Sequence, residues 1–125
     1  MKVCDSSYLV KAILEDESLI RGEQFVAPDI IIFEVANAIW KHECLIRNLD
    51  DGTPYLTLLY DLIKSGKINV LSPNETLMQK SYLIAKNNCI TIYDAVFIAL
   101  ALHLGVSMKT LDKDQIRAFK LEGDK

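Results

Sequence analysis

Four acidic residues, spread over most of the chain, are the side chains best suited to chemistry: Asp5, Glu34, Asp94 and Asp112. Carboxylates gathered in one place repel one another and raise one another's pKa unless a positive charge lies between them. Mg²⁺ and Mn²⁺ meet that need, because they prefer oxygen ligands and accept water and phosphate as well. Brought together, the four acids would form a site that can activate water and stabilise the leaving 3′-oxygen of a phosphodiester.

The stretch around Asp94 predicts how two of these acids meet. Residues 95–102 contain no polar side chain, which predicts a helix buried on all sides. Thr91 and Gly105 are typical of its start and end, so we expect a helix over 92–104 with Asp94 in its first turn. From Asp94 to its end that helix is about 15 Å long, and a strand over 107–112 that runs antiparallel to it is about 16 Å long. Asp94 and Asp112 are therefore expected at the same edge of the domain.

Asp5 and Glu34 also have ordinary structural interpretations. Asp5 follows an expected strand over 1–4 and precedes a helix, where aspartate often serves as an N-cap or turn residue. Glu34 lies one turn into a helix expected over 30–46, where an acid complements the helix dipole. The functional alternatives are a carboxylate at the carboxyl end of the first strand, where open α/β sheets place their sites, and a site acid with Asn37 beside it. The hypothesis of a shared acidic site rests on the occurrence of four acids at such positions in one chain.

The remaining pattern predicts the elements that position these acids. Strands are expected at 25–28, 67–71 and 117–121, and helices at 8–14, at 54–65 and from 73 to about 88. Asp29 is the expected cap of the helix over 30–46, whose apolar face would include Phe33 and Trp40. Residues 72–75 predict a capping box with Pro73 at the first helical position. The order indicates an α/β fold, a small parallel sheet sandwiched by helices, and we expect residues 1–125 to form a single domain.

Composition limits the alternatives. The 125 residues are 50% hydrophobic and carry a net charge of −3, so the chain lacks the basic excess typical of non-specific nucleic-acid binding. The scattered Cys4, Cys44 and Cys89 indicate buried thiols in a reducing compartment, not disulfides or a zinc site. His42 and His103 lie inside expected helices, away from the acids, and we interpret them as structural. Without a signal peptide or an apolar run of about 18 residues, we expect a cytoplasmic protein with no membrane association.

Four short motifs, in order along the chain, carry a family resemblance. They are Val3-Cys4-Asp5-Ser6-Ser7, then Ala27-Pro28-Asp29 leading to Glu34-Val35-Ala36-Asn37-Ala38-Ile39-Trp40, then Tyr93-Asp94-Ala95-Val96-Phe97-Ile98-Ala99-Leu100-Ala101, and Thr110-Leu111-Asp112. In this combination the chain resembles the PIN-domain family over nearly its whole length. The most similar branch is the VapC-type ribonuclease toxins of VapBC toxin-antitoxin modules. The resemblance implies a PIN-like three-layer α/β/α fold.

The resemblance also implies a site and an activity. Asp5, Glu34, Asp94 and Asp112 would form an acidic pocket for Mg²⁺ or Mn²⁺, with the three aspartates as direct ligands and Glu34 acting directly or through water. The positions matching the polar surroundings of the pocket, which hold its ligands or contact phosphate, are Ser6 or Ser7, Asn37 and Thr110. The implied reaction is cleavage of RNA by metal-activated water, leaving 5′-phosphate and 3′-hydroxyl ends. The implied partners are a second copy of the chain and a small antitoxin protein.

Two features depart from the family pattern. The segment 106–109 before Asp112 is more polar than the usual apolar strand, which suggests an irregular or exposed edge. Asp114 is either an additional acid of the pocket or a solvated charge after the strand.

Three other function classes share some features with this sequence. A PIN-like protein that is catalytically weak or inactive and acts as a protein-binding module is favoured by the acidic pI and by the apolar helix at 54–65. A phospho-acceptor receiver domain shares the α/β plan, but Ser6 and Ser7 stand where it needs a second acid, and no acid ends the strand at 68–71. A D-x-D phosphatase fails because Ser7 occupies the second acid's place.

Overall fold

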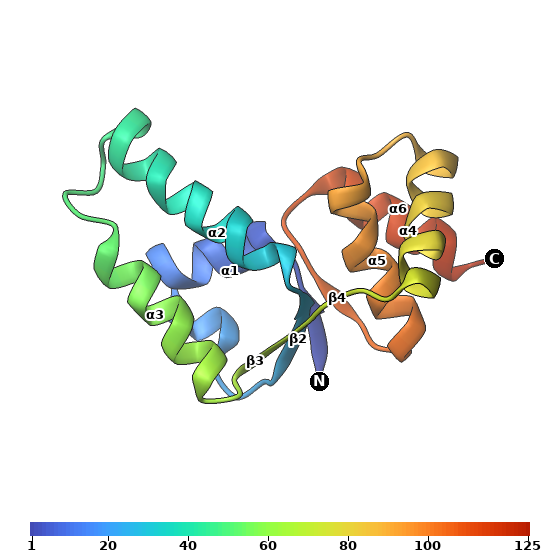
Figure 1. Ribbon diagram of the computed structural model, residues 1–125, viewed down its shortest axis with the longest axis horizontal. Helices are drawn as coiled ribbons and strands as arrows, with labels where there is room; N and C mark the ends of the chain where they lie inside the picture. The colour runs from blue at the N-terminus through green and yellow to red at the C-terminus, as the bar shows by residue number, and fades with distance from the viewer.

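A four-stranded parallel sheet lies at the centre of the computed structural model, which describes all 125 residues (Figure 1). The strands are β1 (Lys2–Cys4), β2 (Phe25–Pro28), β3 (Ile68–Leu71) and β4 (Met108–Lys109), in the order β3-β2-β1-β4. Every neighbouring pair is parallel, and Val3 of β1 lies opposite Val26 on one side and Met108 on the other. β1 is therefore a central strand, and only β3 and β4 are edges.

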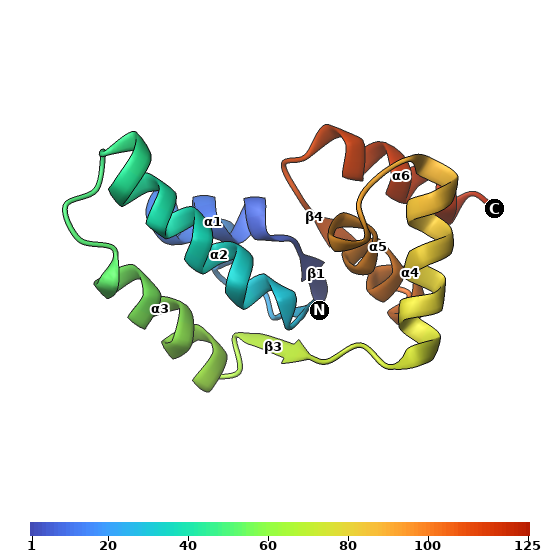
Figure 2. The same cartoon turned by 45° about the horizontal axis from the view of Figure 1, so that its top comes forward.

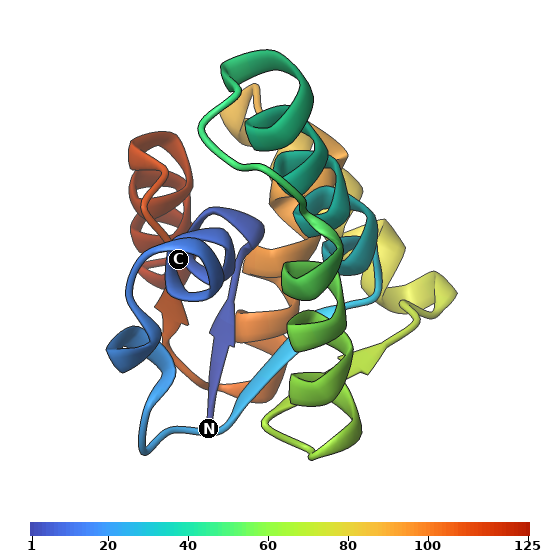
Figure 3. The same cartoon turned by 90° about the vertical axis from the view of Figure 1, so that its left-hand side faces the viewer.

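Two layers of helices enclose the sheet. One layer holds α1 (Ser6–Leu14), α2 (Ile30–Lys41) and α3 (Thr53–Lys64), and the other holds α4 (Glu75–Asn88), α5 (Ile92–Leu104) and α6 (Lys113–Gly123). Figure 2 shows the chain passing from the first layer to the second through β3, and Figure 3 looks onto the first layer with α5 behind the sheet. The predicted α/β fold with helices on both faces is confirmed.

Helix α5 is the centre of the core, as its composition predicts. Residues 95–101 are all buried, at most 4% exposed, and the helix contacts β1, β2, α4 and α6. Its start is capped by Thr91, whose Oγ1 accepts a hydrogen bond from the Asp94 backbone N–H at 3.2 Å. Gly105 ends it in the left-handed region, with φ of 66°. The predicted bounds of 92–104 are confirmed, with Asp94 in the first turn.

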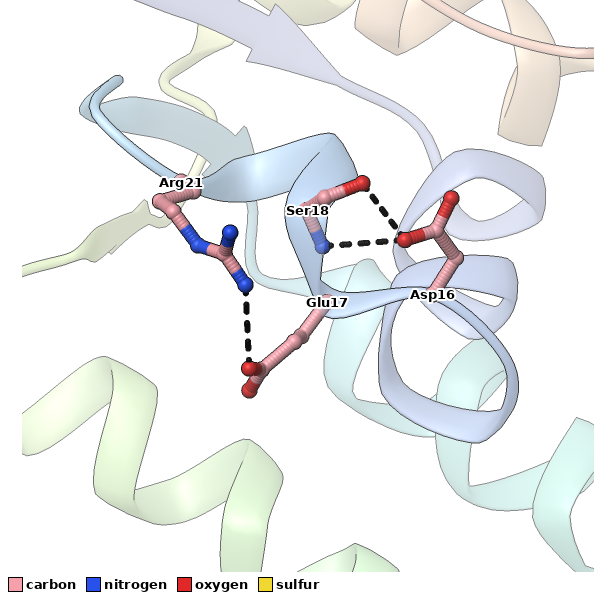
Figure 4. Close-up of polar contacts among 4 residues, drawn as sticks. All are labelled: Asp16, Glu17, Ser18 and Arg21. Carbon is pink, nitrogen blue, oxygen red and sulfur yellow. Dashed lines mark hydrogen bonds and ion pairs between the residues drawn. The ribbon is translucent and has the colours of Figure 1, made fainter.

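The polar stretch after α1 forms a short capped turn that is tied to α1 by the Tyr8 hydroxyl, which donates to the Leu19 carbonyl at 2.8 Å. A single 3₁₀ turn spans Glu17–Ile20, and the Asp16 carboxylate accepts hydrogen bonds from the backbone N–H and the hydroxyl of Ser18, at 3.1 and 2.5 Å (Figure 4). Arg21 and Glu17 form an exposed ion pair at 3.2 Å. Exposed pairs of this kind contribute less than about 1 kcal/mol, so this segment is stabilised mainly by its cap and by buried Ile20.

The carboxyl-terminal segment differs from the prediction. The strand expected at 117–121 is part of helix α6, and the strand expected over 107–112 is only the two residues of β4. The Asp112 carboxylate accepts a hydrogen bond from the Gln115 backbone N–H at 2.9 Å, which starts the helix directly after the strand. Gln115, Ala118 and Phe119 then pack inward at helical spacing.

Two predicted helix starts differ in detail: the cap of α4 lies at another residue, and Asp29 occupies the N-cap position of α2 without a capping hydrogen bond from its side chain. The N-cap of α4 is Asn74, whose Oδ1 accepts from the Leu77 backbone N–H at 2.9 Å, so Pro73 precedes the helix and does not lie in its first turn. Asp29 makes no side-chain cap for α2; its Oδ2 accepts a hydrogen bond from the Ser72 hydroxyl at 2.6 Å. The Asp29 side chain instead ties the ends of β2 and β3 together.

Helix α2 buries only part of the predicted face, because Ile39 is buried but Phe33 and Trp40 are not. Ile31, Val35 and Ile39 are at most 4% exposed, whereas Phe33 and Trp40 are 73% and 51% exposed. Both stripes are apolar at helical spacing, so periodicity alone could not choose between them. Beyond Lys41 the helix widens into a π turn over His42–Ile46, which extends it to the predicted end.

The cysteines are free, but only Cys4 is buried, and burial raises its pKa to about 12. Cys44 and Cys89 are exposed, contrary to the expectation of buried thiols. No single helix is both long enough and apolar enough to cross a membrane; α4 and α5 together reach that length and composition but are bent by 117° between them.

Candidate functional site

The carboxyl ends of β1 and β4 place two of the predicted acids side by side. The chain leaves β1 toward β2 on one side, while β4 lies on the other, so the direction of the strand order changes between β1 and β4. Open α/β sheets bind ligands outside the strand ends at such a point. Asp5 follows β1 directly, and its backbone N–H donates to the Lys109 carbonyl at the end of β4, at 3.1 Å. Asp112 follows β4 by three residues.

Asp5 acts as a helix cap and lies at this edge at the same time. Its side chain is 4% exposed, and its Oδ1 accepts from the Tyr8 backbone N–H at 3.0 Å. The Ser7 hydroxyl donates to the same carboxylate, lying 2.8 and 2.9 Å from its two oxygens. Burial raises the pKa of Asp5, and the hydrogen bonds from Ser7 and Tyr8 oppose that rise. The capping and functional interpretations of Asp5 are therefore compatible.

Glu34 and Asp94 reach the same space from the two helical layers. The Ser6 hydroxyl donates to Glu34 Oε1 at 3.3 Å. Burial raises the pKa of Glu34, the Ser6 hydrogen bond lowers it, and the charges of Asp94 and Asp5 raise it further. The pKa of Asp94 is likewise raised by burial first, and then chiefly by the charge of Asp112. The charges of neighbouring acids thus raise the pKa of Glu34 and of Asp94, as expected if these two residues belong to one shared cluster with Asp5 and Asp112.

Gln115 connects the acids and was missed in the sequence analysis. It is 1% exposed, and its Nε2 donates to the Asp94 backbone carbonyl at 3.0 Å. Its Oε1 accepts from the Thr110 hydroxyl at 2.8 Å, and its backbone N–H is the donor to Asp112. The signal was present: an acid followed three residues later by Gln has capping-box spacing, so Asp112 and Gln115 predict a helix start.

The other predicted polar residues divide into connected and unconnected positions. The Ser7 hydroxyl accepts from the Leu111 backbone N–H at 3.1 Å, and Thr110 Oγ1 accepts from the Asp112 backbone N–H at 3.0 Å. Ser6, Ser7 and Thr110 are thereby joined to the acids, whereas Asn37 is exposed and makes no hydrogen bond to them.

Asp114 lies at the margin of the cluster. Its side chain is exposed and forms an ion pair with Arg117 at 3.7 Å. Its charge also contributes to the raised pKa of Asp94, as the smallest of the effects on that group. Asp114 therefore influences the cluster electrostatically from its solvent side.

The donor set suits a hard divalent cation in charge and atom type. None of the five ion pairs in the structure involves Asp5, Glu34, Asp94 or Asp112, so no basic side chain neutralises them. No three of these side chains converge closely enough to enclose an ion by themselves. Mg²⁺ is commonly held by one or two carboxylates and keeps several waters, so this arrangement fits it.

Comparisons with known proteins agree with the fold and identify a family and relatives with similar sequences. A family model described as PIN domain matches residues 2–120. Ribonuclease VapC3 from Pyrobaculum aerophilum is 27% identical over 126 aligned residues, which cover 94% of this chain and 93% of that protein. The crystal structure of PAE2754, also from Pyrobaculum aerophilum, matches with a TM-score of 0.75 at 20% identity, covering 94% of this chain and 83% of the other. The latter supports the fold alone.

Proposed function

Because this chain belongs to the PIN domain family, we propose that it is a metal-dependent endoribonuclease that hydrolyses RNA phosphodiester bonds. The observation that carries the proposal is the group of acids at the strand-order change, Asp5, Glu34, Asp94 and Asp112, with no cationic partner. A relative named a ribonuclease supports RNA as the substrate. We treat residues 1–125 as one PIN-like domain.

In the proposed mechanism the chain's own residues hold and orient the site. Asp5, Asp94 and Asp112 would hold Mg²⁺ or Mn²⁺, directly or through its bound waters, and Glu34 would contribute directly or through water. The bound ion supplies Lewis-acid chemistry that activates water and stabilises charge on the phosphate and the leaving 3′-oxygen. Ser7 keeps the Asp5 carboxylate in one orientation through its hydrogen bond.

The resemblance to VapC-type toxins extends the proposal to partners. We assign the protein as the toxin of a toxin-antitoxin pair, acting in the cytoplasm as a homodimer and inhibited by a small protein partner. The relative named VapC3 supports the toxin and its protein partner within this assignment.

The alternative function is a protein-binding module with little or no turnover. The observation that favours it is the exposure of large apolar residues on α3: Leu56 and Tyr60, one turn apart, are 36% and 42% exposed, and Leu58, on another side of the helix, is 38% exposed. Only Leu59 of this helix is fully buried, fewer residues than its composition suggests. This alternative predicts a stable protein complex and no metal-dependent cleavage.

Cleavage of a total RNA pool tests the proposed function. Purified protein is incubated with Mn²⁺, Mg²⁺ or a chelator, and new 5′-phosphate ends are mapped. Discrete ends that vanish with the chelator are expected. Asp5→Asn is the control variant, because asparagine keeps the N-cap of α1 while removing the charge, so folding is retained. Equal cleavage by wild type and Asp5→Asn would refute the four-carboxylate site, and no cleavage by folded wild type would favour the binding module.

The Ser7 hydrogen bonds predict a change in pH dependence. Ser7→Ala removes a donor that favours the ionised form of Asp5, so the pKa of Asp5 rises further. Metal binding requires the ionised carboxylate, so the acid limb of kcat/KM against pH is expected to move to higher pH. On that limb the loss is about 10- to 100-fold, the usual size for a residue that orients a metal ligand.

The matched control for Ser7→Ala is Ser65→Ala, which alters an exposed serine after α3. Its acid limb should coincide with that of the wild type. An acid limb for Ser7→Ala that stayed in place, or moved to lower pH, would contradict the assigned role of the Ser7 hydroxyl.

A further inference from the structure

A pocket lies between helices α4, α5 and α6, in the layer that holds all three (Figure 2). Its volume is about 330 Å³, within the range of about 300–1,000 Å³ that is usual for small-molecule sites. Leu102 and His103 of its lining come from the last turn of α5, whereas Asp94 lies in the first turn, about 12–14 Å away along the helix axis. The pocket is therefore separate from the acid cluster.

The inner lining of this pocket is apolar. Ile84 of α4 and Ala99 of α5 are 7% and 1% exposed. Leu83 and Leu102 extend the apolar surface toward solvent and are 55% and 36% exposed. The exposed amide of Asn87 lies beside them and offers both a donor and an acceptor. The surface suits a compact apolar or aromatic body that carries a few heteroatoms, because burying such a body removes apolar area from water.

The outer lining carries a positive charge that no acid compensates. Lys80 and His103 line this pocket and also a smaller one, of about 100 Å³, that adjoins it, and neither residue forms an ion pair. Glu122 is the acid of the lining, and it is already engaged: its Oε1 accepts from the Asn88 amide at 2.8 Å and pairs with the Lys125 ammonium at 3.1 Å. In a protein of net charge −3, the lining therefore attracts anions at Lys80 and His103.

The smaller pocket adds further donors to the same point. Thr76 and Leu77 line it, and they belong to the first turn of α4, which is the positive end of that helix. Glu75, the acid of this turn, lines a different pocket. An anion at Lys80 and His103 would thus be approached from α4, from α5 and from the start of α4.

We propose that the two adjoining pockets form a binding site for a small organic phosphate with an apolar or aromatic body, of which a nucleoside monophosphate is the simplest example. Lys80 and His103 hold the phosphate, and the body lies against Ile84 and Ala99. Lysine binds phosphate as a point charge, and the several oxygens of a phosphate suit donors that come from different sides. The site goes beyond the proposed ribonuclease function and requires neither RNA nor a metal ion.

Titration with adenosine 5′-monophosphate (AMP) in chelator tests the proposal. Without metal the acid cluster repels phosphate, so binding at the cluster is suppressed. In ¹H–¹⁵N correlation spectra, saturable shifts are expected for amides around Lys80 and Ala99 and not for those around Asp5 and Asp94. Adenosine lacks the phosphate and inorganic phosphate lacks the apolar body, so each should bind at least about 10-fold more weakly than AMP.

A matched pair of lysine variants tests the role of Lys80. Lys80→Met removes the ammonium but keeps a long side chain, and it should weaken AMP binding about 5- to 10-fold, between the effects of an exposed ion pair and of a buried hydrogen bond to a charged group. Lys86→Met makes the same change at an exposed lysine of α4 that lines neither pocket, and its affinity should equal that of wild type. Both side chains are exposed, so both variants should remain folded, as far-UV circular dichroism would verify.

Several results would overturn the proposed site. They are absence of saturable AMP binding, equal affinity in Lys80→Met and wild type, and shifts confined to the acid cluster. Adenosine that bound as tightly as AMP would overturn the phosphate assignment, and inorganic phosphate that bound as tightly would overturn the role of the apolar lining. The spectra are recorded without RNA or metal, so the result is independent of cleavage. A protein that bound AMP here but cut no RNA would support this site and count against the proposed function.

Discussion

Asp94→Asn is expected to abolish RNA cleavage while making the metal-free protein more stable. Loss of a metal-binding carboxylate should lower activity by more than about 100-fold, the upper range for residues that only support a ligand. The gain in stability follows from the raised pKa of Asp94. Burial and the charge of Asp112 both disfavour the ionised form of this carboxyl group. Asparagine occupies nearly the same volume and carries no charge.

The size of the stability change depends on pH. Asp94 has a higher pKa in the folded protein than its ordinary value of 3.8. As pH rises through that interval, the unfolded chain loses its proton first, so the free energy of unfolding falls and stays lower at neutral pH. Asp94→Asn removes this loss. The two proteins should therefore differ most at neutral pH and converge as pH falls toward 3.8.

Thermal unfolding at pH 7, with chelator and with Mn²⁺, checks this prediction. In chelator the variant should unfold at a higher temperature than wild type, and Mn²⁺ should stabilise wild type more than the variant, because a ligand stabilises the state that binds it. Asp61→Asn alters an exposed aspartate of α3, outside the cluster, and should change neither property. An Asp94→Asn protein that is less stable in chelator would contradict the prediction.

Gln115→Leu is expected to have the second largest effect, on both stability and activity. Leucine fits the buried volume approximately but removes the hydrogen bonds to the Asp94 carbonyl and the Thr110 hydroxyl. Two lost hydrogen bonds and a half-buried hydroxyl left without its acceptor should lower the free energy of unfolding by about 2–4 kcal/mol. Activity should fall about 10- to 100-fold, because Thr110 and Asp94 lose the group that holds them in register.

Activity measured well below the unfolding temperature separates positioning from unfolding. If Gln115 positions the acids, the folded variant should require more Mn²⁺ for half-maximal rate, a change that reduced stability alone does not produce. Gln79→Leu is the matched control, since Gln79 is exposed on α4 and lies outside this network. Unchanged Mn²⁺ dependence in folded Gln115→Leu would restrict Gln115 to a structural role.

The sequence alone was most informative where a single local arrangement was available. The run 95–101 is apolar on every side, so it has no alternative but a buried helix, and Thr91 and Gly105 define its ends. The alternation of strands and helices then predicts a parallel sheet, and parallel strands bring their carboxyl ends to one edge. The four predicted acids could be selected in this way because each follows a strand or lies early in a helix.

Tertiary packing decided what local patterns left equivalent. Helix α2 has two apolar stripes, and only contact with the sheet and its neighbours determines that Val35 faces inward and Phe33 outward. The segment at 113–123 became a helix because Asp112 caps it and because Gln115 finds buried partners more than 20 residues away at Asp94. A buried polar side chain is stable only when distant groups satisfy its hydrogen bonds, and those groups meet only in the folded chain.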